Sequence, residues 1–292
     1  MPTGISLHIG LNHVDPHAYP PRSVPPLAAA EMDARCMRNV ATYYYQQTDD
    51  LIGSKATSRA VVAHITAAAA ALQAGDLFFL TYSGHGGQFP NRNGDERDDG
   101  LDETWVLYDR VLLNGELHAL LVTFRPDVRV LIISDSSQGG IVNQEEVRRS
   151  IALDASPRIR ARSATGRDLR GLTAAQSATV YEANKAGYDA VQKRHTAGDG
   201  ARIAASILLI TGCQTNQASL DGDDMGLFTE TMLEIWDQGR YAGGYREFFQ
   251  AIVAEMPSYQ TPTWLQLGDI DDAFSSLRPF KVAESQEDPF PS

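Results

Sequence analysis

The sequence predicts an α/β fold in which helices cover both faces of a mostly parallel β-sheet. Short apolar runs rich in β-branched and aromatic residues alternate along the chain with longer stretches of helical spacing. The short runs are apolar on both faces, which is typical of strands buried inside a parallel sheet. The order strand, helix, strand, helix implies right-handed crossovers between strands. A length of 292 residues, of which 43% are hydrophobic, provides ample core for this architecture.

Each element is predicted from its apolar spacing, its length and the turn-forming residues around it. In chain order, the predicted elements are strand 5–10, helix 27–47, helix 57–73, strand 76–82, strand 128–133, strand 205–210, helix 227–236, helix 245–255 and strand 263–267.

This pattern breaks between residues 141 and 202. Seven arginines lie between Glu145 and Arg170, among small and turn-forming residues and without a convincing strand. We predict a solvated insertion that contains one helix over residues 174–192. A more specific interpretation is that the insertion is a linker sensitive to proteolysis.

Charge and composition exclude several classes of function. With 25 Lys and Arg against 37 Asp and Glu, the formal charge is −12, which argues against a nucleic-acid partner. Cys36 and Cys213 alone cannot form a disulfide framework, so a reducing, cytoplasmic location is expected. The first residues lack the pattern of a signal peptide. The longest apolar stretch, 60–72, is too short to span a bilayer, so no membrane partner is expected.

Two loops that directly follow predicted strands carry candidate catalytic residues. One runs from Ser83 through Gly84, His85, Gly86 and Gly87, and the other covers residues 134–140, with the sequence Ser-Asp-Ser-Ser-Gln-Gly-Gly. Ligands of open α/β sheets bind at the carboxyl ends of the strands. A histidine between glycines at that edge is a candidate general base, beside backbone N–H groups that are free to stabilise an oxyanion.

Other catalytic templates are absent from the sequence. We find no Walker loop, no G-x-S-x-G elbow, no H-E-x-x-H motif and no C-x-x-C pair. A flavodoxin-like nucleotide binder would need a loop that cradles phosphate, and none is present. The remaining chemistry is that of a histidine acting with a hydroxyl or thiol nucleophile.

Four ordered segments resemble the metacaspases. They are Y-S-G-H-G-G at 82–87, D-D-G-L-D-E at 98–103, D-S-S-Q-G-G at 135–140 and T-G-C-Q-T-N-Q-A-S at 211–219. His85 precedes residue 137 by 52 residues (137 − 85), close to the caspase spacing of about 50. The resemblance implies a caspase-like three-layer α/β/α sandwich around a mostly parallel six-stranded sheet. It also implies His85 as general base, residue 137 as nucleophile, and an oxyanion hole formed by the N–H groups of Gly86 and residue 137.

The resemblance further implies a single caspase-like domain over residues 1–292. Within it we expect a large-subunit-like part at 4–144, the arginine-rich insertion at 145–202, a small-subunit-like part at 203–270 and a tail at 271–292.

The nucleophile segment departs from the family pattern D-S-C-H-S-G. Ser137 occupies the cysteine position, and Gln138 and Gly139 replace the next two residues. A thiol forms a nucleophilic thiolate with ease, whereas a serine hydroxyl is far less acidic and needs a well-oriented base. We therefore expect an endopeptidase that is weak or inactive with Ser137. The alternative is a catalytically dead relative that binds peptides or partners as a scaffold.

The resemblance also implies substrates with Arg or Lys before the scissile bond. Asp33, Ser83 and Asp135 match the family's positions for the pocket that accepts this basic side chain. Two buried carboxylates would suit the fork of a guanidinium. A second interpretation of Asp33 is an acid that interacts with the dipole at a helix N-terminus.

No cofactor is expected, and calcium is a weak possibility. Residues 95–103 contain six acids, and Asp102 matches one calcium ligand of the family. A further ligand pair of the family is replaced by Asn114 and Gly115. We therefore interpret the acidic stretch as a solvated loop.

Overall fold

The central sheet of the protein has six strands in a computed structural model that describes residues 2–92, 101–137, 169–195, 202–215 and 217–287. The strand order is β2-β1-β3-β7-β8-β9, and the first five strands are parallel while β9 runs antiparallel to β8. The strands are β1 (Gly4–Gly10), β2 (Gln47–Ile52), β3 (Leu77–Ser83), β7 (Arg129–Asp135), β8 (Ser206–Thr211) and β9 (Thr263–Gly268).

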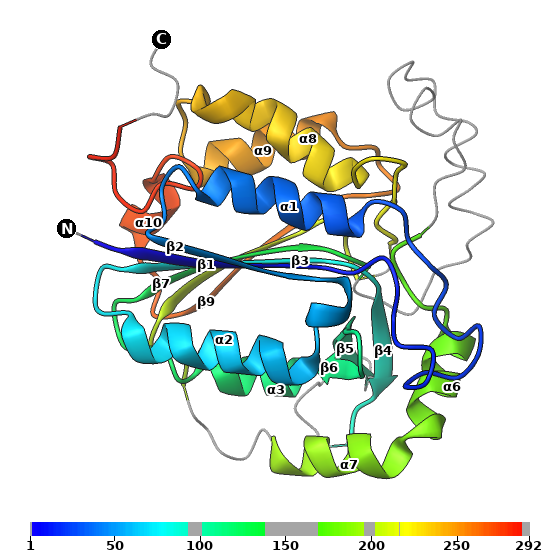
Figure 1. Ribbon diagram of the computed structural model, residues 1–292. Coiled ribbons are helices and arrows are strands. Elements are labelled where there is room, and N and C mark those ends of the chain that lie inside the picture. The colour runs from blue at the N-terminus through cyan, green and yellow to red at the C-terminus, as the bar shows by residue number, and fades with distance from the viewer. Residues whose placement is uncertain (1, 93–100, 138–168, 196–201, 216, 288–292) are drawn as a thin grey trace.

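Helices cover both faces of this sheet, as Figure 1 shows. One face carries α1 (Ala30–Ala41), α8 (Leu227–Trp236) and α9 (Tyr245–Glu255), and the other carries α2 (Ser58–Ala71) and α3 (Asn114–Leu121). Short helices lie at η1 (Gly53–Lys55), η3 (Asp237–Gly239) and α10 (Asp272–Ser276). The predicted three-layer α/β/α sandwich around a mostly parallel sheet is confirmed.

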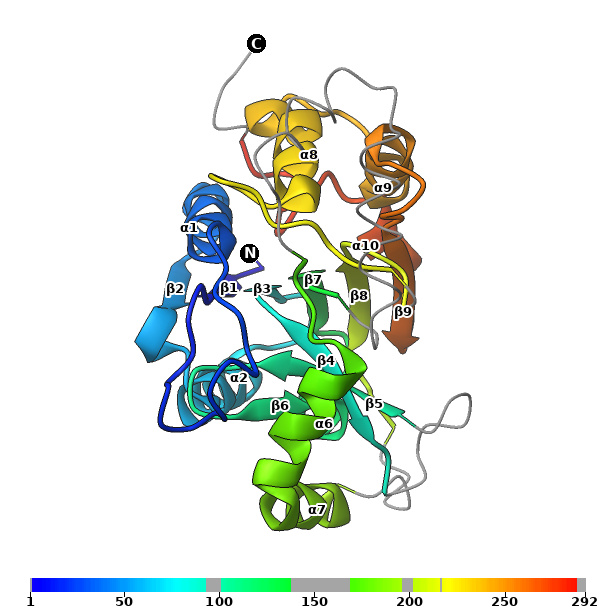
Figure 2. The same ribbon diagram turned by 90° about the vertical axis from the view of Figure 1, so that its right-hand side faces the viewer.

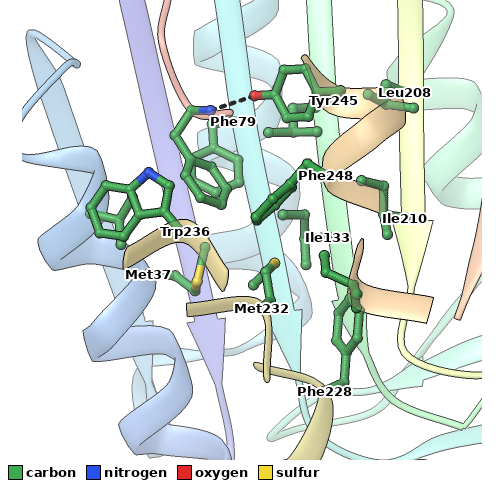
Figure 3. Packing of buried hydrophobic residues seen from close by; sticks show 14 of the residues in the cluster. Met37, Phe79, Ile133, Leu208, Ile210, Phe228, Met232, Trp236, Tyr245 and Phe248 are labelled. Carbon is green, nitrogen blue, oxygen red and sulfur yellow. Dashed lines mark hydrogen bonds between the residues drawn. The ribbon is translucent and has the colours of Figure 1, made fainter. Parts of the chain in front are cut away.

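The alternation of side chains along buried strands produces two hydrophobic cores. On β3, Phe79 faces the core shared with α1, α8 and α9, where it lies in one cluster with Met37, Met232 and Phe248 (Figure 3). Its neighbour Phe78 belongs to the opposite core, together with residues of α2 and α3. Because both faces of the central strands are buried, these strands read as continuous apolar runs in the sequence.

A small antiparallel sheet lies beside the central one. It consists of β4 (Gly86–Pro90), β5 (Leu101–Val106) and β6 (Val111–Leu113). Two helices, α6 (Ala174–Ala183) and α7 (Lys185–Arg194), lie against this sheet in Figure 2. A third hydrophobic cluster joins them, with Phe89 of β4 in edge contact with Tyr181 and Tyr188.

The structure corrects two expectations about secondary structure. The predicted helix 27–47 is shorter, because α1 ends at Ala41 and the edge strand β2 begins at Gln47. The single helix predicted over 174–192 is two helices separated at Asn184, which has the non-helical backbone angles φ −137° and ψ 40°. Both of these helices bury aromatic side chains, so residues 174–194 are not a solvated insertion. Residues 145–168 and 196–201 of the predicted linker lie outside the described residues.

Among the described helices, none combines the length and the apolar character needed to cross a membrane.

His8 provides the first testable prediction, because it is a fully buried histidine in the central strand β1. Its Nδ1 lies 2.9 Å from the Thr81 hydroxyl. Burial, with a smaller contribution from Arg38, lowers the pKa of His8 to about 3. The folded protein therefore keeps His8 neutral, while the unfolded chain takes up a proton below pH ~6.5. This contribution to stability is present above that pH and is lost as the pH falls toward the folded pKa.

We expect His8→Gln to make the free energy of unfolding less sensitive to acid. Between pH 7.5 and 5.0, the wild-type chain should lose about 2 kcal/mol more than the variant. Urea unfolding at the two pH values measures this difference. An equal loss in both chains would show that His8 does not resist protonation.

Candidate active site

The predicted functional loops leave the central sheet at one edge, where the carboxyl ends of β3 and β7 adjoin. The register of these two strands places Ser83 beside Asp135. His85 follows Ser83 by two residues, and Ser137 follows Asp135 by two residues. The next strand, β8, ends beside β7 at the same edge, with Thr211 opposite Ser134. This is the edge at which open α/β sheets bind ligands.

Asp33, Ser83 and Asp135 meet in a buried pocket at this edge. The Ser83 hydroxyl donates a 2.8 Å hydrogen bond to Asp33 Oδ2. All three residues are 3% exposed or less, so their polar atoms depend on partners within the protein. The family resemblance implied that these three residues share a pocket, and the structure brings them together.

Backbone and hydroxyl donors hold the two carboxylates in place. The Gly226 N–H donates to Asp33 Oδ1 at 3.0 Å. The hydroxyls of Ser219 and Thr229 donate to the two oxygens of Asp135, at 2.5 and 2.6 Å. These donors orient each carboxylate independently of a bound cation. Carboxylates held in this way favour selective binding of a cation in a fixed geometry.

A third carboxylate, Asp221, completes the pocket and was not predicted. It is 2% exposed, and its Oδ2 accepts a 2.6 Å hydrogen bond from the Ala28 N–H just before α1. The sequence offered one signal for it, since Asp221 follows the recognised segment that ends at Ser219 by two residues.

The side chain of Arg170 fills this three-carboxylate pocket. Its Nη1 lies 2.6 Å from Asp33 and 3.0 Å from Asp135. Its Nε and Nη2 donate to Asp221 Oδ1 at 3.0 and 2.8 Å. Nη1 also donates to the Ser83 hydroxyl at 2.7 Å. The guanidinium is therefore paired through every one of its nitrogens and is completely buried.

Burial and charge act in opposite directions within the pocket. Burial lowers the pKa of Arg170, but Asp135, Asp33 and Asp221 outweigh it and raise that pKa above its ordinary value. Arg170 therefore stays charged. Burial, with a smaller contribution from the nearby Asp135, raises the pKa of Asp33 to about 6 although Arg170 lowers it. The pocket holds three acids around one cation, so its stability depends on that cation.

The main chain of Arg170 is bound as firmly as its side chain. Its carbonyl oxygen accepts hydrogen bonds from the N–H groups of Gly86, at 3.2 Å, and of Ser137, at 2.8 Å. Its own N–H donates to the Ser219 carbonyl at 2.9 Å. Two N–H groups converging on one carbonyl oxygen form the arrangement that stabilises an oxyanion during acyl transfer. They are the two N–H groups that the resemblance implied for this role.

The residues on either side of Arg170 continue this binding. Leu169 forms an antiparallel bridge with Leu220, and Gly171 forms a parallel bridge with Gly86. The Leu172 N–H donates to the Gly86 carbonyl at 2.8 Å. Four consecutive residues are therefore held by main-chain contacts to Gly86 and Ser137 on one side and to Ser219 and Leu220 on the other.

Gly86 can only be glycine in this arrangement. A Cβ at position 86 would lie 1.8 Å from the backbone oxygen of Ser137. The glycine thus lets the two loops approach closely enough for both N–H groups to reach the same carbonyl oxygen.

The ring of His85 has one nitrogen engaged and the other free. Its Nε2 lies 2.8 Å from the Pro25 carbonyl oxygen, which can only accept, so the neutral ring carries its proton there. Among the described residues, Nδ1 has no hydrogen-bond partner although it is buried. Burial lowers the pKa of His85 to about 4. At neutral pH the ring therefore presents an unprotonated nitrogen, as a general base must.

Ser137 is fully buried, and its hydroxyl oxygen accepts a 2.9 Å hydrogen bond from the Ser219 N–H. No hydrogen bond joins His85 to Ser137 among the described residues, because Nδ1 is unpaired. The Ser137 N–H nevertheless binds the Arg170 carbonyl oxygen, and His85 directly precedes Gly86, whose N–H binds the same oxygen.

The acidic stretch 95–103 lies largely outside the described residues, which resume at Leu101. Asp102, the candidate calcium ligand, is 1% exposed and lies opposite Phe89 in the β4–β5 pair. The interpretation as a solvated loop is wrong for Asp102, because this residue is buried within strand β5, and it does not belong to the pocket around Arg170. The absence of a calcium site thus remains a prediction from the sequence.

Known proteins resemble this chain in sequence and in fold. The family model of the caspase domain (Peptidase_C14) matches residues 4–272. Metacaspase-1 from Emericella nidulans is 44% identical over 73 residues, which are 23% of this chain and 18% of that protein. Metacaspase-1A from Aspergillus terreus is 42% identical, also over 73 residues, with the same shares of the two chains. The chain thus matches less than a fifth of the length of these relatives.

A solved structure is similar over nearly the entire chain. It is the protein GSU0716 from Geobacter sulfurreducens, with a TM-score of 0.82 and 40% sequence identity. The match covers 97% of this chain and all of that one.

Proposed function

The chain belongs to the caspase-domain family of peptidases, and on this premise we propose that it is built as an endopeptidase directed at arginine or lysine before the scissile bond. His85 and residue 137 form the catalytic pair in this proposal, and Asp33, Ser83, Asp135 and Asp221 bind the basic side chain. With Ser137 in the cysteine position, the activity is weak or absent.

One observation supports this proposal above the others: an arginine side chain and its own carbonyl group are bound at the same time. The guanidinium of Arg170 is paired with three carboxylates while its carbonyl oxygen accepts from the N–H groups of Gly86 and Ser137. A peptidase must recognise a side chain and polarise the adjoining carbonyl together. A merely structural ion pair has no need of the second set of contacts.

The proposed reaction assigns a role to each group around that carbonyl. Nδ1 of His85 takes the proton of the nucleophile at residue 137, and the two N–H groups stabilise the negative charge that develops on the carbonyl oxygen. The same histidine then returns the proton to the leaving amine. Cysteine suits this pair because its thiol, with a pKa near ~8.5, ionises readily. The hydroxyl of Ser137 does not. Among the described residues no carboxylate orients the His85 ring, since its Nε2 is bound to the Pro25 carbonyl.

The pocket favours arginine over lysine. Asp221 is approached by Nε and Nη2 of Arg170, while Asp33 and Asp135 are approached by Nη1. A lysine side chain has one nitrogen, so it cannot contact both groups of oxygens as the guanidinium does. Lysine is therefore accepted more weakly. We also propose that the reaction needs no metal and that the protein works in a reducing, cytoplasmic location.

A scaffold without catalysis is the second candidate. Two observations favour it: Ser137 is a poor nucleophile beside a histidine that has no carboxylate partner among the described residues, and the pocket already holds an arginine of the same chain. In that case the cleft binds basic peptides or partners and releases them unchanged.

The experiment that decides between these candidates is hydrolysis of fluorogenic peptides by Ser137→Cys. We expect kcat/KM for a peptide ending in arginine to rise by about two orders of magnitude or more over the Ser137 chain. The rate should follow the order arginine, lysine, glutamate, and Asp221→Asn should reduce the preference for arginine over lysine.

Ser136→Cys is the matched control, because it places a thiol one residue away in an equally buried position. It should give no gain in hydrolysis. If Ser137→Cys is folded, leaves its own chain intact and is inert toward all three peptides, the peptidase proposal fails and the scaffold remains.

A further inference from the structure

The pocket and the oxyanion hole described above bind a segment of the chain itself, residues 169–172. Figure 2 shows the stretch that leads into α6 running along the end of the sheet where β3 passes into β4. Leu169 and Leu172 are 5% and 0% exposed, and Arg170 is 0% exposed. The segment is thus buried in the cleft and does not lie across its surface.

The contacts of this segment follow the order expected of a bound peptide substrate. Before Arg170, Leu169 pairs with Leu220; at Arg170, the N–H, the carbonyl and the side chain are all bound. After it, Gly171 and Leu172 pair with Gly86. Binding therefore extends over both sides of the Arg170–Gly171 bond. A structural ion pair alone does not require the carbonyl of its arginine to lie between the N–H groups of Gly86 and Ser137.

We infer that residues 169–172 are a tethered ligand that occupies the substrate cleft and closes it to other peptides until Arg170 is withdrawn. This inference rests on the proposed function, because it takes the cleft to be one that recognises arginine peptides. The contacts of Arg170 identify the occupant of the cleft. Three carboxylates bind its guanidinium, and two N–H groups bind its carbonyl oxygen.

Tethering makes this occupation strong. A segment of the same chain is present at a high effective concentration, and a free peptide must compete with it. The observed affinity for an outside peptide is reduced in proportion to the fraction of molecules whose cleft is open. Because the three acids would otherwise be buried without a cation, the open form is costly and its fraction is small.

The first test measures binding of a fluorescein-labelled peptide, Leu-Arg-Gly-Leu-Thr, which copies residues 169–173. Fluorescence anisotropy should show binding to Arg170→Ala at least about tenfold tighter than to the wild-type chain. Arg194→Ala, which removes an exposed arginine of α7, is the matched control and should behave as wild type. The same peptide with glutamate in place of arginine should not bind. Equal binding by the wild-type chain and Arg170→Ala, or no binding by a folded Arg170→Ala, would overturn the inference.

A second measurement uses the wild-type chain and holds even if Arg170→Ala does not fold. Trypsin under native conditions should leave the Arg170–Gly171 bond intact while it cuts after the exposed Arg194. Cleavage after Arg170 at a rate equal to that after Arg194 would show that the segment is not held in the cleft. The peptide-binding and trypsin measurements keep Ser137 in place and need no catalysis. They can therefore fail while Ser137→Cys hydrolyses peptides, and they can succeed while Ser137→Cys is inert.

Discussion

Replacing Arg170 with methionine is expected to lower the free energy of unfolding by about 3–5 kcal/mol at pH 8. The substitution keeps much of the side-chain volume and removes the positive charge. Asp33, Asp135 and Asp221 are then buried without a cation, each 2% exposed or less. An uncompensated buried charge costs far more than a lost surface pair. Urea unfolding of the variant and the wild-type chain measures the loss.

Two further results distinguish this mechanism from loss of packing. Arg240→Met removes an exposed pair with Asp237, so it should cost no more than about 1 kcal/mol. In the wild-type chain the pKa of Asp33 is raised to about 6, because burial raises it more than Arg170 lowers it. Arg170→Met removes the cation, so the pKa of Asp33 rises further. The folded variant then binds a proton more tightly than the unfolded chain, so stability should recover as the pH falls from 8 toward 5. A loss below about 1 kcal/mol, or one independent of pH, would show that Arg170 does not compensate the three buried carboxylates.

Ser137→Cys is expected to convert the intact chain into two fragments. The thiol proton passes to Nδ1 of His85, and the sulfur attacks the carbonyl carbon of Arg170. The bond to the Gly171 nitrogen breaks as that nitrogen takes up the proton, and water then releases Arg170 as a carboxylate. The N–H groups that hold this carbonyl belong to Gly86 and to residue 137 itself, so the nucleophile is attached to the same residue as one donor.

A time course on denaturing gels measures this conversion. Because the segment is already bound in cis, the rate should be first order and independent of protein concentration. The Ser137 chain should stay intact, and His85→Ala in the Cys background should prevent the cut. Ser136→Cys should leave the chain uncut as well. A rate proportional to protein concentration would mean that one molecule cleaves another.

The central sheet could be predicted from sequence because its strands are buried on both faces. The continuous apolar run that contains Phe78 and Phe79 predicts a strand even when the partners of each residue are unknown. Helices α8 and α9 have the bounds predicted from their amphipathic spacing. The small sheet was missed because β4 contains two glycines and a proline and β6 has three residues, so neither gives a strand signal.

The pocket could be predicted only where its residues belong to short motifs. Asp33, Ser83 and Asp135 were found because each lies within a recognisable segment at a strand or helix end. Arg170 was counted among seven arginines of a solvated insertion, since an arginine usually lies at the surface. Its burial depends on acids that are distant in the sequence, Asp221 being 51 residues away. The one local signal was its position among the apolar residues Leu169 and Leu172 and next to a glycine.

The intact mass of the fragments from Ser137→Cys shows whether the catalytic residues cut the segment bound in their own cleft. If Arg170–Gly171 is held in the position of a scissile bond, the two masses correspond to residues 1–170 and 171–292, with one water added. Fragments that end at another arginine or lysine would agree with a pocket for basic side chains, but they would refute the placement of Arg170 in the cleft. Fragments that end at acidic or apolar residues would refute the basic pocket itself. A folded Cys variant that stays intact would contradict the claim that residue 137, His85 and the Arg170 carbonyl form a working catalytic arrangement.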